Sequence, residues 1–517
     1  MKKYLFLSAI MSLSVMVSCG DDDGEDLIDF TVSFSSETVS LSEADTDKEI
    51  SLTFSRAATE SGTITVAYTG NNAEYGTDFS TLPTGGNGTI AVPVAVGDLG
   101  ATITFTKLQD PIEGTTKTVS LALNGYDQTD WSNGITSSST VSFTPIAAIS
   151  GVIDAEQGGS NQPNQVYVDL SSNTQTAVRR DTWEIAFYNG AENRVFLNPS
   201  LLVAAAELEG ITDILSITED SDLANALKMN TFDQAFQPAT VTVTTVGELV
   251  AGLPVAYPQY GNVATNLVFT DNREGTLEGT AFAAVSTTAD QNNVYIVSLG
   301  NEIPTESAEL GSISTTGDQR GFLKVRVLTD GNSYTVQYAD LNETENFSEA
   351  TIEKNDSFNL SAFSLTEGQS VNVEPEKGSW DLNFTGVFSF YGVGNFGGPP
   401  TIAGLTFSDY VLHNTLGGTG LYQVTTYERD GDGNITNFDV PSYTDFNRDD
   451  VEESAFIYND RAVIGSGWRS VFGVAAVRDD RYFVLKDMDG NYYKLLFTAF
   501  TNSEGERGFP QFTYERL

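Results

Sequence analysis

Asp181-Thr-Trp183-Glu-Ile-Ala-Phe187 and Gly378-Ser-Trp380-Asp-Leu-Asn-Phe384 repeat one pattern, in which a tryptophan and an acidic residue precede an aliphatic-x-Phe strand. Each stretch is followed, much later, by two apolar runs joined at an Asp-Gly pair, at Asp330-Gly331 and Asp489-Gly490. Asp-Gly pairs favour hairpins, because type I′ turns need positive φ at both central residues. The internal repeat therefore predicts two related β domains, at residues 160–345 and 355–517.

The sequence before the repeat also has the pattern of strands. Residues 29–148 contain alternating runs rich in Thr, Val and aromatic residues, such as Gly62-Thr-Ile-Thr-Val-Ala-Tyr68. Within the first repeat copy, the segment Leu201–Met229 has the alanine-rich and capped runs that are typical of helices. We therefore expect a mainly β protein of three domains, with one short helical insertion in the first repeat copy.

Composition excludes several classes of function. The chain has 517 residues, with 26 Lys plus Arg against 70 Asp plus Glu, and its formal charge is −44. Such an acidic chain lacks the basic patches that bind nucleic acid or anionic lipid. With one His and one Cys, it offers almost nothing for a His-built zinc site, a Ser–His–Asp triad or a disulfide. We expect no enzyme activity and no nucleic-acid partner.

The N-terminal residues have the pattern of an export signal. Lys2 and Lys3 precede the largely apolar run Tyr4–Val17, which is too short to span a bilayer. The run ends at Val17-Ser-Cys19-Gly, which resembles a bacterial lipobox, and the acidic stretch after it resembles the surface-export signal of Bacteroidota lipoproteins. We predict a signal peptide at 1–18, acylation of Cys19 as the membrane anchor, and an acidic tether at 19–28. The expected location is the outer membrane, exposed at the cell surface.

The first β unit resembles the Calx-β family of immunoglobulin-like sandwiches. The order of its motifs, a Ser-Glu turn, a Gly-x-Asp-Phe motif and an Asp-x-x-Glu motif before a late strand, carries the resemblance. Some members bind Ca²⁺ at one end of the sandwich, and Ca²⁺ takes hard oxygen ligands. The positions that match are Glu43, Asp78, Asp110 and Glu113. The alternative is that these carboxylates are structural and cap backbone amides in turns.

The two repeat copies resemble the HmuY family, Bacteroidota outer-membrane lipoproteins of which some take haem from host haemoproteins. The resemblance rests on the Trp-acidic-aliphatic-x-Phe strand, the Asp-Gly hairpin and the ending Gly508-Phe-Pro-Gln-Phe-Thr-Tyr514. It implies non-enzymatic capture of haem or a related porphyrin, with a host haemoprotein or an outer-membrane transporter as partner. The alternative is a structural or adhesive surface module that does not bind haem.

Haem ligation in this family would use pairs of His or Met side chains, as the resemblance implies. His413 is the only histidine, so a bis-His site within one chain is impossible. His413 and Met488 are the ligand candidates, and a structural role for His413 is the alternative. Arginines between 461 and 481 are candidates for a basic patch that would meet haem propionates. The four tryptophans, Trp131, Trp183, Trp380 and Trp468, are expected in the core.

Overall fold

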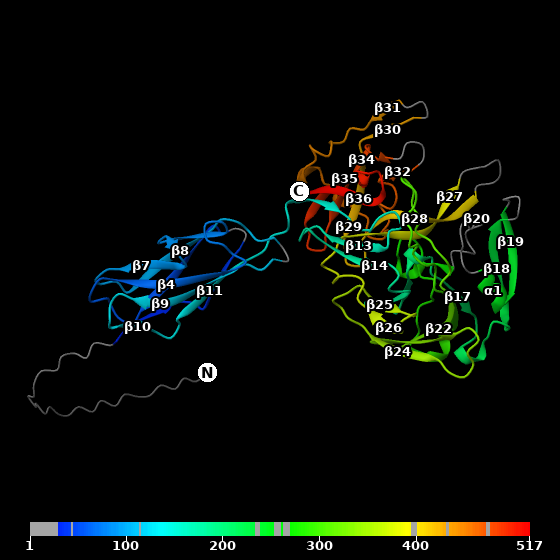
Figure 1. Cartoon of the computed structure of the whole chain (residues 1–517), viewed down its shortest axis with the longest axis horizontal. Coiled ribbons are helices and arrows are strands. Elements are labelled where there is room, and N and C mark those ends of the chain that lie inside the picture. Colours follow the sequence, from blue (N-terminus) through cyan, green and yellow to red (C-terminus); the bar gives the residue numbers. More distant parts are fainter. Residues whose placement is uncertain are drawn as a thin grey trace, which may run out of the picture. The chain divides into compact units, whose positions relative to one another are not determined.

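The computed structural model divides the chain into two compact units, Met1–Ile146 and Ala147–Leu517. The residues it describes are 29–42, 45–112, 115–232, 238–252, 260–261, 269–393, 401–430, 434–471 and 476–517. The units are coloured blue to cyan and cyan to red in Figure 1.

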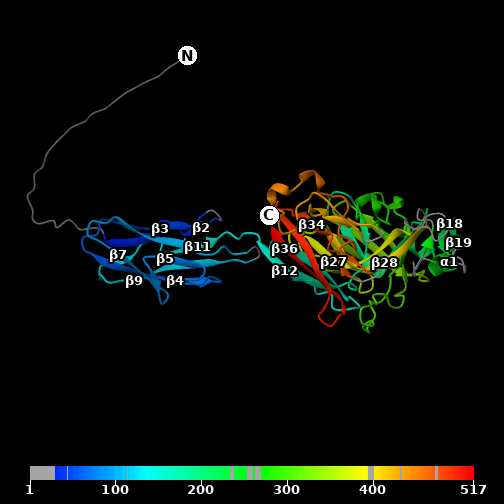
Figure 2. The same ribbon diagram turned by 90° about the horizontal axis from the view of Figure 1, so that it is seen from above.

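The first unit is a β-sandwich of two sheets, whose strands run side by side in Figure 2. One sheet has the order β10 (Trp131–Asn133), β1 (Phe30–Phe34), β3 (Asp47–Phe54), β8 (Gly100–Lys107), β5 (Phe79–Leu82). The other has the order β2 (Thr38–Leu41), β11 (Ser138–Phe143), β9 (Thr118–Tyr126), β4 (Gly62–Asn71), β7 (Thr89–Val94), β6 (Gly85–Gly86). Alternate residues of both sheets, such as Phe30, Val32 and Phe34 of β1, form one core, as period-2 strands require. The predicted sandwich is confirmed.

The second unit contains four larger sheets. The first is β12 (Ser150–Asp154), β36 (Arg507–Arg516), β35 (Tyr492–Thr501), β34 (Arg481–Lys486), β29 (Gly420–Thr425). The second is β14 (Thr174–Arg179), β13 (Asn164–Asp169), β27 (Leu382–Val393), β28 (Thr401–His413), β20 (Tyr260–Gly261). The third is β16 (Val195–Leu197), β15 (Ile185–Tyr188), β25 (Leu360–Ser364), β26 (Gln369–Val371). The fourth is β17 (Ala204–Leu208), β21 (Val294–Ser298), β22 (Phe322–Thr329), β23 (Ser333–Asp340), β24 (Ser348–Glu353).

Short two-stranded sheets complete the unit. They are β18 (Asp222–Phe232) with β19 (Pro238–Thr245), β30 (Tyr427–Arg429) with β31 (Ile435–Asn437), and β32 (Arg469–Ser470) with β33 (Ala476–Val477). Both hairpins are confirmed: β22 and β23 flank Gly331 at φ +97°, and β34 and β35 flank Gly490 at φ +88°. The expected type I′ turns are wrong, because only the glycine of each Asp-Gly pair has positive φ.

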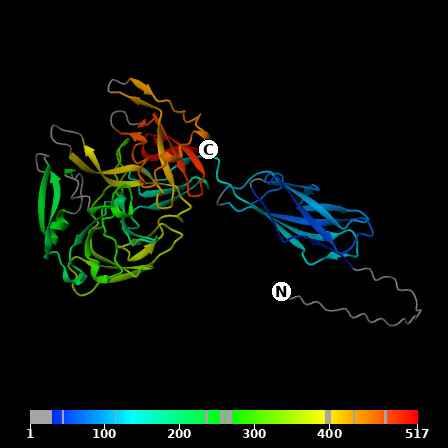
Figure 3. The same ribbon diagram turned by 180° about the vertical axis from the view of Figure 1, so that it is seen from behind.

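The two repeat copies exchange strand pairings within this unit. Strand β13 of the first copy pairs with β27 of the second, with Val166 opposite Phe384, and β15 pairs with β25, with Ala186 opposite Ala362. The cyan and green segments of the first copy consequently lie among the yellow and red segments of the second, in the view of Figure 1 and in the view from behind in Figure 3. The segments 160–345 and 355–517 are thus packed as one unit instead of two separate domains, because each completes sheets of the other.

The short helical insertion expected in the first copy is confirmed, but its expected position at Leu201–Met229 is wrong. The structure has the 3₁₀ turns η1 (Pro199–Leu201) and η2 (Ile214–Ser216) there, together with β17 and the start of β18. The α-helix of the first copy is α1, at Val246–Gly252. Alanine has high helix propensity, but Ala204, Ala205 and Ala206 are fully buried and pair with β21. Their small side chains fit between packed layers, so tertiary packing overrides local propensity.

Candidate functional site

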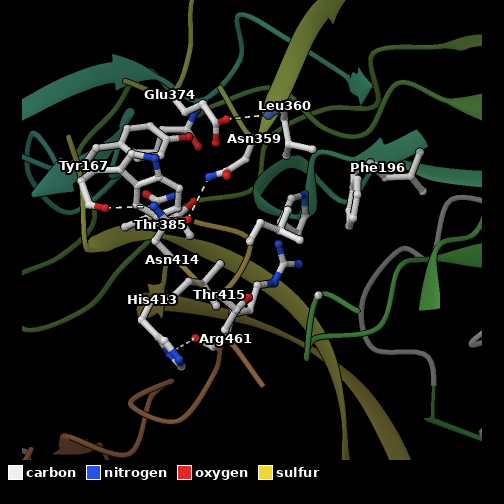
Figure 4. Close-up of a pocket in the computed structure, with 18 of the residues that line it drawn as sticks. Tyr167, Phe196, Asn359, Leu360, Glu374, Thr385, His413, Asn414, Thr415 and Arg461 are labelled. Atoms are coloured by element: carbon white, nitrogen blue, oxygen red, sulfur yellow. Dashed lines mark hydrogen bonds between the residues drawn. The ribbon is translucent and has the colours of Figure 1, made fainter. Parts of the chain in front are cut away.

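A cavity of about 70 Å³ lies inside the second unit, between strands of both repeat copies (Figure 4). Its lining includes residues of β13, β16, β27 and the end of β28, and of the loops that carry Asn359, Glu374 and Arg461. A volume of this size holds about five water molecules. The junction of the repeats therefore contains an internal site with room for a small molecule.

The two repeated tryptophans line this cavity together. Trp183 lies just before β15 and Trp380 just before β27, which are equivalent places in the two copies. Trp380 meets Tyr167 of β13 edge to face, with ring centroids 5.1 Å apart. Trp131 and Trp468 are core residues as predicted, at 6% and 0% exposure, and Trp183 is also buried, at 7%. The expectation for Trp183 and Trp380 was incomplete, because these two rings also form the wall of a cavity.

Several cavity-lining side chains carry buried polar atoms without a hydrogen-bond partner among the described residues. They are Gln165 Nε2, Trp183 Nε1, Trp380 Nε1 and Asn383 Oδ1. Gln165 is 2% and Asn383 9% exposed. A buried polar group left unpaired costs about 1–3 kcal/mol, and such groups are rare in folded proteins. Four of them around one cavity indicate that a polar occupant completes the site.

Glu374 adds a carboxyl group to the cavity. Its Oε1 accepts a hydrogen bond from the backbone N–H of Leu360 at 2.6 Å. Burial raises the pKa of Glu374 to about 8, although backbone hydrogen bonds act in the opposite direction. Glu374 is therefore mostly protonated and uncharged at neutral pH.

Arg461 adds a cation. Its Nε donates to the carbonyl of Arg273 at 3.1 Å, and its backbone N–H donates to Glu274. Arg461 has no ion pair within 4.0 Å among the described residues, and Figure 4 shows its side chain extending between His413 and Leu360. Burial lowers its pKa, opposed by the negative field of Asp271. The carboxyl of Asp271 accepts from the N–H groups of Leu197 and Ala281, and burial raises its pKa to about 6.

His413 is buried, at 2% exposure, and both of its ring nitrogens are engaged. Nδ1 lies 3.1 Å from the carbonyl oxygen of Arg461, and Nε2 lies 3.1 Å from that of Ile457. Burial lowers the pKa of His413 to about 4, although the two carbonyls favour the protonated ring. In Figure 4 the ring is turned away from Glu374 and Asn359.

These residues do not fit the axial ligands of a haem. Iron would need a ring nitrogen of His413 that is free of its carbonyl contact and reachable by the metal. Met488 is 45% exposed in the turn between β34 and β35 and does not line the cavity. The cavity is also far smaller than a porphyrin. The structure thus gives His413 a structural place and does not bring it together with Met488.

Of the four candidate Ca²⁺ ligands, Glu43 and Glu113 lie outside the described residues. Asp78 is 4% exposed, and its carboxylate accepts from Lys117 Nζ at 2.5 Å and from the N–H of Glu74 at 2.8 Å. Asp110 pairs with Lys107 Nζ at 2.5 Å. No group of three or more His, Cys, Asp or Glu able to hold a metal occurs among the described residues. Lysine ammonium groups thus neutralise the two carboxylates that the structure describes.

Three arginines of the expected basic patch pair with carboxylates. Arg469 pairs with buried Asp409 at 3.2 Å, whereas Arg478 and Arg481 both pair with Asp480. These two guanidinium groups lower the pKa of Asp480 despite its partial burial. Each of these three arginines is thus paired with a local carboxylate, and the basic patch stays a prediction.

Cys19 and the predicted signal peptide lie outside the described residues. Among the described residues, no helix is long and apolar enough to cross a membrane.

The second unit is a set of β-sheets to which both repeat copies contribute strands, with a cavity between the copies. The sequence model of the HmuY protein family matches residues 161–346 and 332–514, which together cover more than half of the chain. The chain belongs to the HmuY family, and the tandem resemblance found in the sequence is confirmed.

Comparison with solved structures gives distant neighbours. The apo form of the Calx CBD1 domain is 12% identical, with a TM-score of 0.19, and the match covers 22% of this chain and 96% of that one. A two-domain protein of unknown function from Bacteroides fragilis is 12% identical, with a TM-score of 0.17, covering 43% of this chain and 82% of that one. Scores this low give no information on function. No curated protein matches the sequence.

The sequence reveals some cavity residues and not others. The repeat singles out Trp183 and Trp380, and Arg461 stands out only as one of several arginines. Gln165, Glu374 and Asn383 belong to no motif, and they meet only because β13 and β27 pair across the two copies. The equivalence of the two tryptophans was the signal that could have located the site.

Proposed function

We propose that this protein is a lipoprotein, anchored in the outer membrane through acylated Cys19 and exposed at the cell surface, that captures a small ligand without changing it chemically. The observation that carries the proposal is the set of four unpartnered polar atoms on side chains lining one cavity. Membership of the HmuY family supports a binding role. The proposed binding site is the cavity between the repeats, with Trp183 and Trp380 as its walls.

The family suggests haem, but the residues of this chain favour a smaller ligand. His413 would have to give up a carbonyl contact to reach iron. We therefore expect no Soret shift that depends on His413 when residues 20–517 are mixed with hemin at micromolar concentration. A shift that His413→Ala or Met488→Ala abolishes would restore haem capture as the function.

Ligand capture is tested by differential scanning fluorimetry of residues 20–517. The probes are neutral sugars, amino acids and small carboxylates, each at about 10 mM, which detects dissociation constants up to the millimolar range. A ligand at ten times its dissociation constant stabilises by about 1.4 kcal/mol and raises Tm by a few degrees. The shift should be lost in the double variant Trp183→Phe, Trp380→Phe. If no probe shifts Tm, the structural or adhesive alternative is favoured.

The anchor is tested separately. In cells that carry out lipoprotein modification, labelled palmitate should be incorporated into the full chain and not into the Cys19→Ala variant. The variant should also leave the membrane fraction, because acyl chains supply the membrane affinity at about 0.8 kcal/mol per buried CH₂. Retention of label by Cys19→Ala would contradict the lipoprotein proposal.

A further inference from the structure

The unpartnered polar groups around the cavity are mainly donors. An indole Nε1 can only donate, and Gln165 Nε2 is also a donor, so Asn383 Oδ1 is the single acceptor of the four. An amide can be assigned with its oxygen and nitrogen exchanged, but the two indoles cannot. The occupant that satisfies these groups must therefore offer several hydrogen-bond acceptors.

The charged side chains that line the cavity indicate the charge of its occupant. Arg461 is a cation without an ion pair within 4.0 Å among the described residues. The carboxyl of Asp271, with a pKa of about 6, is mostly ionised at pH 7, and its negative charge acts on Arg461 from beyond 4.0 Å. Its oxygens already accept two backbone N–H groups, so it forms no direct ion pair with the guanidinium. A buried cation is costly unless an anion pairs with it. Glu374 does not supply that anion at neutral pH, because its raised pKa keeps it mostly protonated.

Gly275 makes room for the cation. It has φ +72°, and a Cβ there would lie 2.4 Å from Cδ of Arg461. Any larger residue at this position would displace the side chain of Arg461. The glycine therefore leaves the space that this side chain occupies at the edge of the cavity. The lining thus combines two indole donors with a positively charged guanidinium.

We infer that the ligand is a small carboxylate, whose oxygens accept hydrogen bonds from Arg461, Trp183 and Trp380. The inference rests on the proposed function and names the chemical class of the captured molecule. Guanidinium–carboxylate bonds are charge-assisted and can be bidentate. The volume, about five water molecules, limits the ligand to a short organic acid.

The test is isothermal titration of residues 20–517 at pH 7 with matched pairs of probes: acetate and acetamide, and L-lactate and L-lactamide. At least one carboxylate should bind about tenfold or more tightly than its neutral partner. Arg461→Gln should weaken the carboxylate by about 10- to 100-fold, as expected for loss of a charged hydrogen bond, and weaken the neutral probe much less, so that the preference for the carboxylate is lost. Arg461→Lys should restore part of the preference.

Two further variants separate donor loss from misfolding. Trp183→Phe and Trp380→Phe keep the ring and remove only the N–H, so each should weaken carboxylate binding by about three- to tenfold. Arg429→Gln is the matched control, because that side chain is 51% exposed and pairs with Asp479. It should bind all probes as the unmodified chain does.

The pH dependence gives an independent readout. The titratable groups that line the cavity together with Glu374 are Tyr167 of β13, His413 of β28 and Arg461 of the loop. Tyr167 is the one that interacts with the Glu374 charge, whereas the His413 ring is turned away from it (Figure 4). Tyr167 and His413 remain uncharged at pH 7 to 9, and a guanidinium group keeps its charge over this range. Carboxylate affinity should therefore fall as pH rises through about 8, where Glu374 ionises, and Glu374→Gln should abolish the fall.

Distinct results overturn the two proposals. If neutral probes bind as well as carboxylates, or if Arg461→Gln leaves the preference intact, the ligand class is wrong and ligand capture stands. If no carboxylate binds at about 10 mM, the ligand class is also wrong. If no probe of any class binds, the proposal of ligand capture is wrong as well.

Discussion

Trp183 and Trp380 hold equivalent places in the two repeat copies, and both line one cavity with an indole N–H that has no partner among the described residues. Equivalent residues of a tandem repeat in separate domains would line two sites. Here the pairing of β13 with β27 and of β15 with β25 brings them to one. The duplicated motif therefore contributes two halves of a single site.

His413 gives a direct test of the buried cavity wall. Its imidazole signal should titrate near pH 4 instead of about 6.5, because burial disfavours the charged ring. His413 is the only histidine, so a two-dimensional NMR spectrum shows one ring to follow. Since its pKa in the folded chain is lowered, it contributes stability above pH 6.5 that is lost as pH falls towards 4. Titration near 6.5 would show that the ring is exposed.

Glu374 should make stability depend on pH in the opposite direction. Its pKa is raised from 4.5 to about 8 in the folded chain. Its contribution is present below pH 4.5 and is lost as pH rises through 8. Glu374→Gln, which cannot ionise, should be more stable than the unmodified chain at pH 9 by on the order of a few kcal/mol, and similar at pH 4. Urea unfolding at the two pH values measures both. An equal difference at the two values would contradict the raised pKa.

Asp409 forms buried ion pairs that stabilise the second unit. It is fully buried at φ +50°, and its carboxylate contacts Arg469, Arg507 and Gln162. Asp409→Asn tolerates the same backbone conformation but leaves two buried guanidinium groups without an anion. We expect a loss of about 3–5 kcal/mol in the free energy of unfolding, measured by denaturant titration. Asp479→Asn, at an exposed pair, should change it by less than about 1 kcal/mol.

The lysines beside Asp78 and Asp110 predict a weak response of the first unit to calcium. Lys117 and Lys107 already neutralise these carboxylates. In residues 20–517, millimolar Ca²⁺ should therefore change the Tm of the first unit by no more than about one degree. A true Ca²⁺ site, with Ca²⁺ at 100 times its dissociation constant, would instead raise the free energy of unfolding by about 2.7 kcal/mol. Lys117→Met should lower the Tm, because it leaves Asp78 buried and unpaired. A calcium-dependent rise of several degrees would establish the Ca²⁺ site.

Local patterns reveal the strands but not their neighbours. Period-2 alternation identifies β1, and the Asp-Gly pairs locate the turns after β22 and β34. The alanine run at 204–206 is misleading, because its strand is dictated by pairing with β21 in a buried layer. The sequence around Gln165 and Glu374 also gives no sign that they line a site, because they are brought to the cavity by the pairing of strands from different copies.

The second unit begins with β12 and ends with β36, and these two strands pair, with Ser150 opposite Glu515 and Ile153 opposite Phe512. A ribosome delivers the first of them long before the second. Until β36 emerges, β12 has no neighbour and β35 keeps an open edge, so the sheet cannot close during synthesis. Pairings this distant along the chain form slowly. The sheet that joins the two ends of the second unit is therefore completed only after translation has passed its last strand.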